Sequence, residues 1–224
     1  MPYMQVRVTS TTPYVGSSTV TVQELKHAVP KKAQKEMEKA EKAHLQQRKD
    51  EVKEHLNRAV SIDPEFVAAR NNLAAIYLTE GDGEAAVAQL EEAVKIDPHN
   101  PILFTNLTLG YTMTHKLDAA ERAARERLLL DRTSAKAHLF LGLVLVEKQR
   151  FTDEALRCLE RAREEHPLAH LLAARVLIGQ GNSERARAEI QTYLSTERDE
   201  ANRAIATSWL DRIASERKRA AALP

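Results

Sequence analysis

A single stretch decides the fold of this chain: VAARNNLAAIYLTEGDGEAAVAQLEEAVKIDP, residues 67–98. In its first half, apolar residues recur at three- and four-residue spacing, which puts them on one face of a helix. The second half shows the same spacing. Between the halves lie Gly81 and Gly83, which disfavour a continuous helix and supply the backbone freedom of a tight turn. The stretch therefore predicts two amphipathic helices joined as a hairpin.

The end of the stretch and its small residues add two expectations. We expect Asp97 to cap the following helix and Pro98 to occupy its first turn, where the missing N–H costs little. We expect Ala74, Ala86 and Ala93 to lie where helices approach closely. A larger side chain there would cost about 1–3 kcal/mol through overpacking.

The same hairpin recurs along the chain. One copy earlier, at a 34-residue step, the sequence has Ala40, Ala59 and Pro64 where this stretch has Ala74, Ala93 and Pro98. One copy later, Leu107, Tyr111 and Ala120 stand for Leu73, Tyr77 and Ala86. One hairpin cannot bury its apolar faces alone, whereas stacked copies can. The sequence therefore predicts an all-α array of about five hairpins.

The predicted organisation has three parts: an N-terminal extension over 1–30, the repeat array over 31–194, and a capping helix with a tail over 195–224. The predicted helices are 31–47 and 51–62, the pair within 67–98, a third copy over 101–134, a fourth over 135–167, a fifth beginning with 169–178, and a last helix over about 197–217. The fourth copy carries an insertion around residues 149–151, which should be tolerated cheaply. The last helix should face the array with Ala201, Ile205, Trp209, Leu210 and Ile213.

The N-terminal extension does not follow the repeat pattern. Residues 4–9 alternate in the manner of a strand, and residues 22–28 predict a short helix before Pro30. Two interpretations stay open. Either the extension is flexible, or it is the last strand of a β domain in a longer protein.

Composition points to a folded helical protein without unusual charge. The 224 residues are 43% hydrophobic, 29% charged and 4% aromatic, and the formal net charge is +1. No overall attraction to nucleic acid or anionic lipid follows, and no apolar run approaches a membrane span. Without a secretory signal we expect a cytoplasmic protein, or a periplasmic or envelope protein if the chain is a fragment.

The sequence offers little chemistry. Cys158 stands alone and is best explained as a small helix residue. His166 and His170 have a spacing that could bind metal, but Pro167 between them should make them diverge. No phosphate loop, catalytic triad or metalloprotease motif is present, so we expect no enzyme activity, no cofactor and no metal. The basic clusters at residues 31–35 and 217–219 are best explained as solvated charge.

The repeats resemble tetratricopeptide repeats (TPRs), on the pattern Leu73, Ala74, Tyr77, Gly81, Ala86, Leu90, Ala93 and Pro98. The resemblance implies a right-handed α-solenoid whose first helices line a concave groove. It also implies a scaffold that holds peptides or helices of partner proteins. A β-like extension ahead of such an array is similar to bacterial proteins in which a small β-sandwich precedes the repeats.

Helical geometry then predicts the groove residues: Asn71, Asn72, Ala75, Thr79, Thr105, Asn106, Leu109, Met113, Lys136, Phe140 and Val144. The amides of Asn72 and Asn106 could bind a peptide backbone, or instead bridge neighbouring helices. Some family members hold a partner's terminal carboxylate with a cation cluster, which Asn71 and Phe140 interrupt here. Apolar residues on the groove floor favour an amphipathic partner segment.

The predicted function is therefore a non-enzymatic scaffold that binds a segment of another protein. Two alternatives remain. The array could self-associate, for example as a homodimer, through its last helix around Trp209. It could also be the accessory part of a larger cell-envelope protein.

Overall fold

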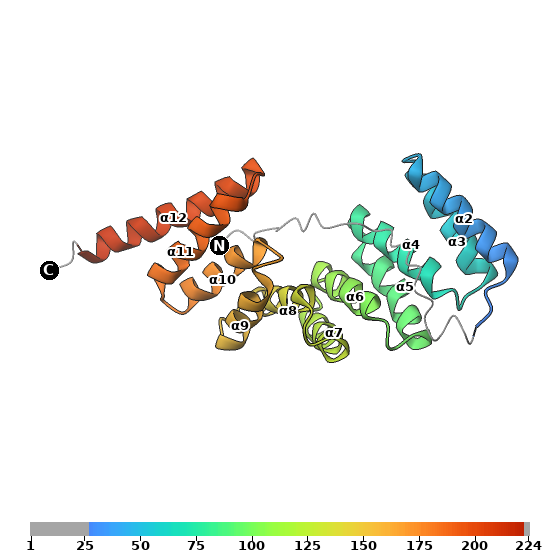
Figure 1. The fold of residues 1–224 in the computed structure, drawn as a ribbon, viewed down its shortest axis with the longest axis horizontal. Coiled ribbons are helices and arrows are strands. Elements are labelled where there is room, and N and C mark those ends of the chain that lie inside the picture. The colour runs from blue at the N-terminus through green and yellow to red at the C-terminus, as the bar shows by residue number, and fades with distance from the viewer. Residues whose placement is uncertain (1–26, 222–224) are drawn as a thin grey trace. The chain divides into compact units, whose positions relative to one another are not determined.

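A computed structural model describes residues 27–221 of the chain, with side chains through residue 215. Within this range every regular element is an α-helix (Figure 1). The helices are α2 (Lys31–Leu45), α3 (Lys49–Ile62), α4 (Val67–Glu80), α5 (Gly83–Ile96), α6 (Pro101–Met113), α7 (Leu117–Leu130), α8 (Ala135–Glu147), α9 (Asp153–Ala162), α10 (Leu168–Gly179), α11 (Ser183–Thr196) and α12 (Glu200–Ala221). The all-α prediction is confirmed over these residues.

The predicted strand over residues 4–9 and most of the predicted helix over 22–28 lie outside the described residues. Residues 27–30 are not helical, so that helix does not extend to Ala28.

The chain divides into two compact units, Met1–Asn106 and Leu107–Pro224, and the boundary falls inside α6. In the first unit α2 packs on α3, α3 on α4, and α4 on α5. In the second unit each helix from α7 to α12 packs on the next, and α8 also contacts α10. Each unit is thus built from hairpins that pack on their neighbours in chain order.

Small residues form the seams between helices, as their spacing predicted. Ala74, Ala86 and Ala93 are fully buried, and so are their counterparts Ala40 and Ala59. Ala40 and Ala59 belong to a core with larger apolar residues, among which are Val52, Leu56 and Leu73, with Met37, Phe66, Ile76 and Tyr77 packed against it. Close helix approach at these positions leaves no room for a larger side chain.

The turn between hairpins differs from the prediction. Asp97 ends α5 and does not cap α6, because α6 begins only at Pro101. Pro98 lies in the turn, and the Asn100 side chain accepts a hydrogen bond from the Ile102 N–H at 3.1 Å. Asp131, one repeat later, likewise ends its helix and accepts from the Thr133 N–H at 3.0 Å. These aspartates therefore build the turn itself.

The turn within the second hairpin follows the sequence signal in part. Gly81 has φ 84°, a left-handed conformation that a residue with a Cβ adopts at a cost. Gly83 lies in the first turn of α5 with no positive φ, so only the first glycine of the pair is required by the backbone. Asp82 caps α5 by accepting from the Ala85 N–H at 3.0 Å.

The predicted insertion is a five-residue connection between α8 and α9, over residues 148–152, and it is anchored at both sides. Lys148 Nζ lies 2.5 Å from Asp118 Oδ1 and 2.7 Å from Glu121 Oε2, both on α7. The Phe151 ring packs so closely on α10 that a Cβ added to Gly179 would overlap it. The insertion therefore links helices before and after its own hairpin.

The last helix begins later than predicted. Asp199 caps it by accepting from the Asn202 N–H at 2.9 Å. Ala206 and Ile213 are buried, and Ile205, Trp209 and Leu210 are half-buried, in agreement with most of the predicted stripe. Ala201 is exposed, so its assignment to that stripe is wrong. It lies about 140° around the helix from the buried Ala206.

Candidate functional site

The residues predicted to line a groove divide by exposure. Five of them are buried: Asn72, Ala75, Thr105, Phe140 and Val144. The other six are half-buried or exposed: Asn71, Asn106, Leu109, Thr79, Met113 and Lys136. The accessible surface is thus smaller than predicted, because a first helix inside an array is covered by neighbours on more than one side.

Asn72 and Asn106 occupy equivalent positions and make equivalent contacts. Asn72 Nδ2 lies 4.0 Å from Met37 Sδ on α2. Asn106 Nδ2 donates to Asn71 Oδ1 at 2.9 Å, from α6 to α4. Both contacts span 35 residues and reach back to the preceding first helix. These side chains bridge neighbouring helices, which was one of the two alternatives open from the sequence.

The Asn71–Asn106 pair leaves hydrogen-bonding groups available. The Asn71 amide nitrogen and the Asn106 carbonyl oxygen have no hydrogen bond to the described residues, while the bond between the two side chains fixes both amides. Both residues are half-buried. A donor and an acceptor held side by side are complementary to the carbonyl and N–H of a peptide unit.

The hydroxyl groups of the two predicted groove threonines donate hydrogen bonds to backbone carbonyls of their own helices. Thr79 Oγ1 donates to the Ile76 carbonyl at 2.7 Å, and Thr105 Oγ1 donates to the Pro101 carbonyl at 3.1 Å. Each hydroxyl keeps only acceptor capacity, and Thr105 is also buried.

In the second unit, the candidate residues that remain accessible are of two kinds. Leu109 is half-buried and Met113 is 41% exposed, so both present apolar surface. Lys136 is exposed on the first turn of α8 and makes no ion pair with the described residues. Phe140, which stands where a carboxylate-binding cation would be expected, is buried.

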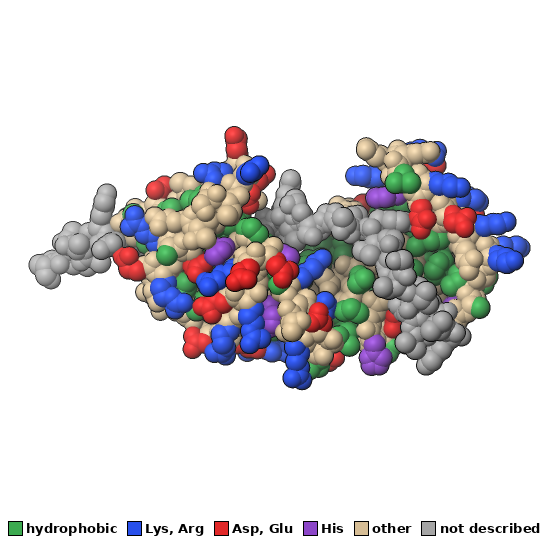
Figure 2. Space-filling model, viewed as in Figure 1, with side chains coloured by type: hydrophobic (Ala, Val, Ile, Leu, Met, Phe, Trp, Pro, Cys, Tyr) green, Lys and Arg blue, Asp and Glu red, His purple; other side chains and the backbone are tan. Residues whose placement is uncertain are grey.

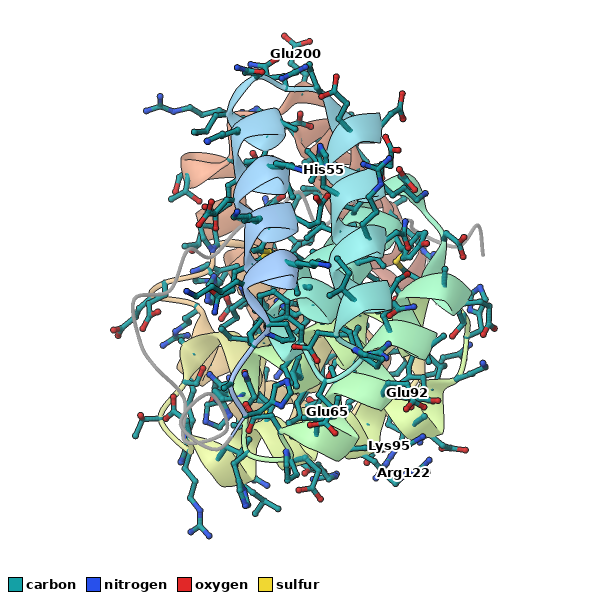
Figure 3. All side chains as sticks on the ribbon, turned by 90° about the vertical axis from the view of Figure 1, so that its right-hand side faces the viewer. His55, Glu65, Glu92, Lys95, Arg122 and Glu200 are labelled. Atoms are coloured by element: carbon teal, nitrogen blue, oxygen red, sulfur yellow. The ribbon has the colours of Figure 1, made fainter. Side chains whose placement is uncertain are left out.

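The sequence analysis missed a set of polar pairs within hairpins. His55 Nδ1 lies 2.8 Å from Glu36 Oε2 between α3 and α2 (Figure 3). His170 Nδ1 lies 2.6 Å from Glu189 Oε2 between α10 and α11. Hydrogen bonds from Lys39 and His55 hold the pKa of Glu36 below its usual range. The 19-residue spacing of each pair was the available signal.

Glu121 is the centre of an ion-pair network in the second unit. It is 12% exposed and bonds Lys148, Arg125 and Arg150 at 2.7, 2.8 and 2.9 Å. Burial alone would raise its pKa. Hydrogen bonds from Lys148 and Arg125, with the charge of Arg150, outweigh burial and hold the pKa at about 2. The network joins α7 to the 148–152 connection and is structural.

The other titratable groups whose pKa is shifted lie singly or in structural pairs within the described residues. Burial raises the pKa of the Cys158 thiol to about 11, so it stays protonated and unreactive. Burial lowers the pKa of His166, and His170 is engaged with Glu189. Among the described residues, no three His, Cys, Asp or Glu side chains come together as metal ligands.

None of the described helices is long and apolar enough to cross a membrane.

Hairpins that stack in chain order, with small residues in their seams, define a helical repeat protein. Two family patterns, both described as Tetratricopeptide repeat, match this chain, one over residues 43–108 and the other over residues 146–204. Together the two matches cover more than half of the chain, and the chain belongs to the tetratricopeptide repeat family. Members of this family are protein–protein interaction scaffolds and generally non-catalytic.

Individual proteins of known sequence or structure are also similar to this chain. The chain is 31% identical over 91 residues to the E3 ubiquitin-protein ligase CHIP of Arabidopsis thaliana, a match covering 39% of this chain and only 33% of that protein. A thermophilic TPR protein of Thermus thermophilus superposes with a TM-score of 0.62 at 20% identity, covering 80% of this chain and 98% of that one. YrrB, described as a TPR protein with an unusual peptide-binding site, has a TM-score of 0.66 at 16% identity, covering 83% and 95%.

Proposed function

We propose that this protein is a non-enzymatic scaffold whose first helices bind an extended segment of another protein. The observation that carries the proposal is the Asn71–Asn106 pair, which leaves one amide donor and one carbonyl acceptor oriented and unused. An extended peptide needs such groups because its own backbone N–H and C=O are unpaired. The pair would bind the backbone and leave the partner's side chains free to vary.

The second unit supplies different chemistry to a partner. Met113 and Leu109 offer apolar contact, and the flexible thioether of methionine adapts to differing partner side chains. Lys136 adds an unpaired positive charge. We therefore expect partner segments that combine apolar and acidic residues.

Similar proteins support the proposal without defining the partner. YrrB is described by its peptide-binding site, which agrees with a peptide ligand for the same fold. CHIP is matched over a third of its length only, so its ligase activity is no guide to this chain.

Self-association through α12 lacks a supporting observation. Trp209 and Leu210 are half-buried against the array. No large apolar side chain of α12 is among the exposed ones, as far as residue 215. We therefore keep partner binding as the proposal.

Removing both amides should weaken partner binding. The double variant Asn71→Ala with Asn106→Ala is expected to weaken binding roughly 5- to 150-fold, because two backbone hydrogen bonds at about 0.5–1.5 kcal/mol each are lost. Binding peptides would first be selected against the full-length protein from a random library. Their dissociation constants would then be measured by calorimetry for both proteins.

Asn72→Ala is the matched control. Asn72 is the same residue type at an equivalent position, but it is buried against Met37 and has no free edge. Its replacement should leave affinity within about two-fold. Equal binding by the double variant, or an equal loss in Asn72→Ala, would exclude the amide pair as the binding site.

A further inference from the structure

The first helix of the array carries a stripe of lysines. Successive residues of a helix advance by about 100°, so the lysines of α2 fall within an arc of about 100° that contains none of its buried alanines. The arc is about 16 Å long and all its lysines are exposed. We call this surface the lysine stripe, made of Lys31, Lys32, Lys35, Lys39 and Lys42.

Most of the lysine stripe is unpaired. Within the described part of the chain, only Lys39 has an ion pair, with Glu36 at 2.5 Å. The other four make no ion pair or side-chain hydrogen bond with the described residues. The helix's glutamates, Glu36 among them, all lie outside the arc. Figure 2 shows Lys and Arg side chains gathered along the position of α2.

Helix stability explains Lys42, in the last turn of α2, but not the lysines at the start of the helix. The first turn of α2 has no acidic residue, and the Pro30 N-cap makes no side-chain hydrogen bond. Lys31 and Lys32 therefore stand in the first turn, at the positive end of the helix dipole, where lysine is unfavourable and Asp or Glu would stabilise. A charge pattern that opposes local stability points to a role outside the fold.

We propose that the lysine stripe docks this protein onto the anionic headgroups of a membrane surface. A helical protein partner would need an apolar seam, and the arc contains only lysines and Gln46. Recognition of nucleic-acid bases would add arginines or stacking aromatic side chains to phosphate contacts, and the arc has neither. A flat anionic lipid surface needs only clustered lysines. The net charge of +1 does not oppose this, because attraction acts within about a Debye length.

The test is sedimentation of the full-length protein with lipid vesicles. Vesicles of phosphatidylcholine alone would be compared with vesicles that also contain phosphatidylserine, at low and at high salt. We expect binding to the anionic vesicles only, and its loss at high salt. The variant Lys31→Gln, Lys35→Gln, Lys42→Gln should reduce the partition coefficient roughly 100-fold, from about five-fold for each lysine.

The matched control is a variant that also loses three positive charges, but from helices other than α2. Lys95→Gln, Arg122→Gln and Arg157→Gln replace exposed residues of three other helices and should leave binding within a few-fold. An equal loss in this control would overturn the assignment to α2. So would equal binding to both vesicle types, or binding of an RNA oligonucleotide or polyglutamate with none to vesicles. Circular dichroism of both variants should show unchanged helicity.

Discussion

Replacing Gly142 with alanine is expected to lower the free energy of unfolding by about 1–3 kcal/mol, the usual cost of overpacking a filled core. Gly142 lies in α8, where the α9 side chain of Leu159 packs directly on its backbone. A Cβ at Gly142 would lie 2.5 Å from Leu159 Cδ2 and 2.7 Å from Leu159 Cγ. Leu159 is fully buried and cannot move into solvent. Urea denaturation followed by circular dichroism would measure the loss.

A double-mutant cycle makes this prediction specific. Leu159→Ala alone should cost about 2–5 kcal/mol through the cavity it leaves. In the Leu159→Ala background, Gly142→Ala should cost much less, because the atoms that it would strike are gone. Additive losses would show that the steric conflict lies elsewhere.

Neutralising Glu121 should produce a pH-dependent loss of stability. The pKa of Glu121 is about 2 in the folded protein against 4.5 ordinarily, so its charged form stabilises the fold above pH 4.5. That contribution is lost as the pH falls from 4.5 towards 2. Glu121→Gln should therefore lower the free energy of unfolding by about 1–3 kcal/mol at pH 7 and by little near pH 2. The loss at pH 7 is only moderate because Arg125 and Arg150 are partly solvated, which weakens their ion pairs with Glu121.

The control for Glu121 is on the same helix. Glu126 is exposed and has no ion pair with the described residues, so Glu126→Gln should have little effect at either pH. Denaturation by urea at several pH values would compare the three proteins. A pH-independent difference between wild type and Glu121→Gln would contradict the ionic origin of the effect.

The hairpins could be predicted from the sequence because helix formation and burial follow local periodicity. Apolar spacing located each helix pair, and the 34-residue step located buried alanines such as Ala40 and Ala93. Helix ends were less predictable. Asp97 is a good N-cap residue by type, but it ends α5 instead. At the start of α6 it is the Asn100 side chain that accepts a hydrogen bond from a backbone N–H, that of Ile102.

The candidate site was predictable in position but not in side-chain direction. The sequence placed Asn71 and Asn106 on first helices, and both keep accessible edges. It could not show that Asn72 turns back against Met37, because that direction depends on the neighbouring helix. The contacts of Glu121 with Lys148 and Arg150 were missed for the same reason, since these residues are 27 and 29 positions away and meet Glu121 only in the folded unit.

The anchored 148–152 connection also affects how the second unit comes apart. In a simple row of hairpins each copy touches only its neighbours, so the ends can open while the middle holds. Here Lys148 and Arg150 form ion pairs with Glu121 on α7, and the Phe151 ring packs on Gly179 of α10. The connection therefore contacts both the preceding and the following copy. Amide protons of α7, α8 and α10 should accordingly exchange with solvent at similar rates, as one cooperative block.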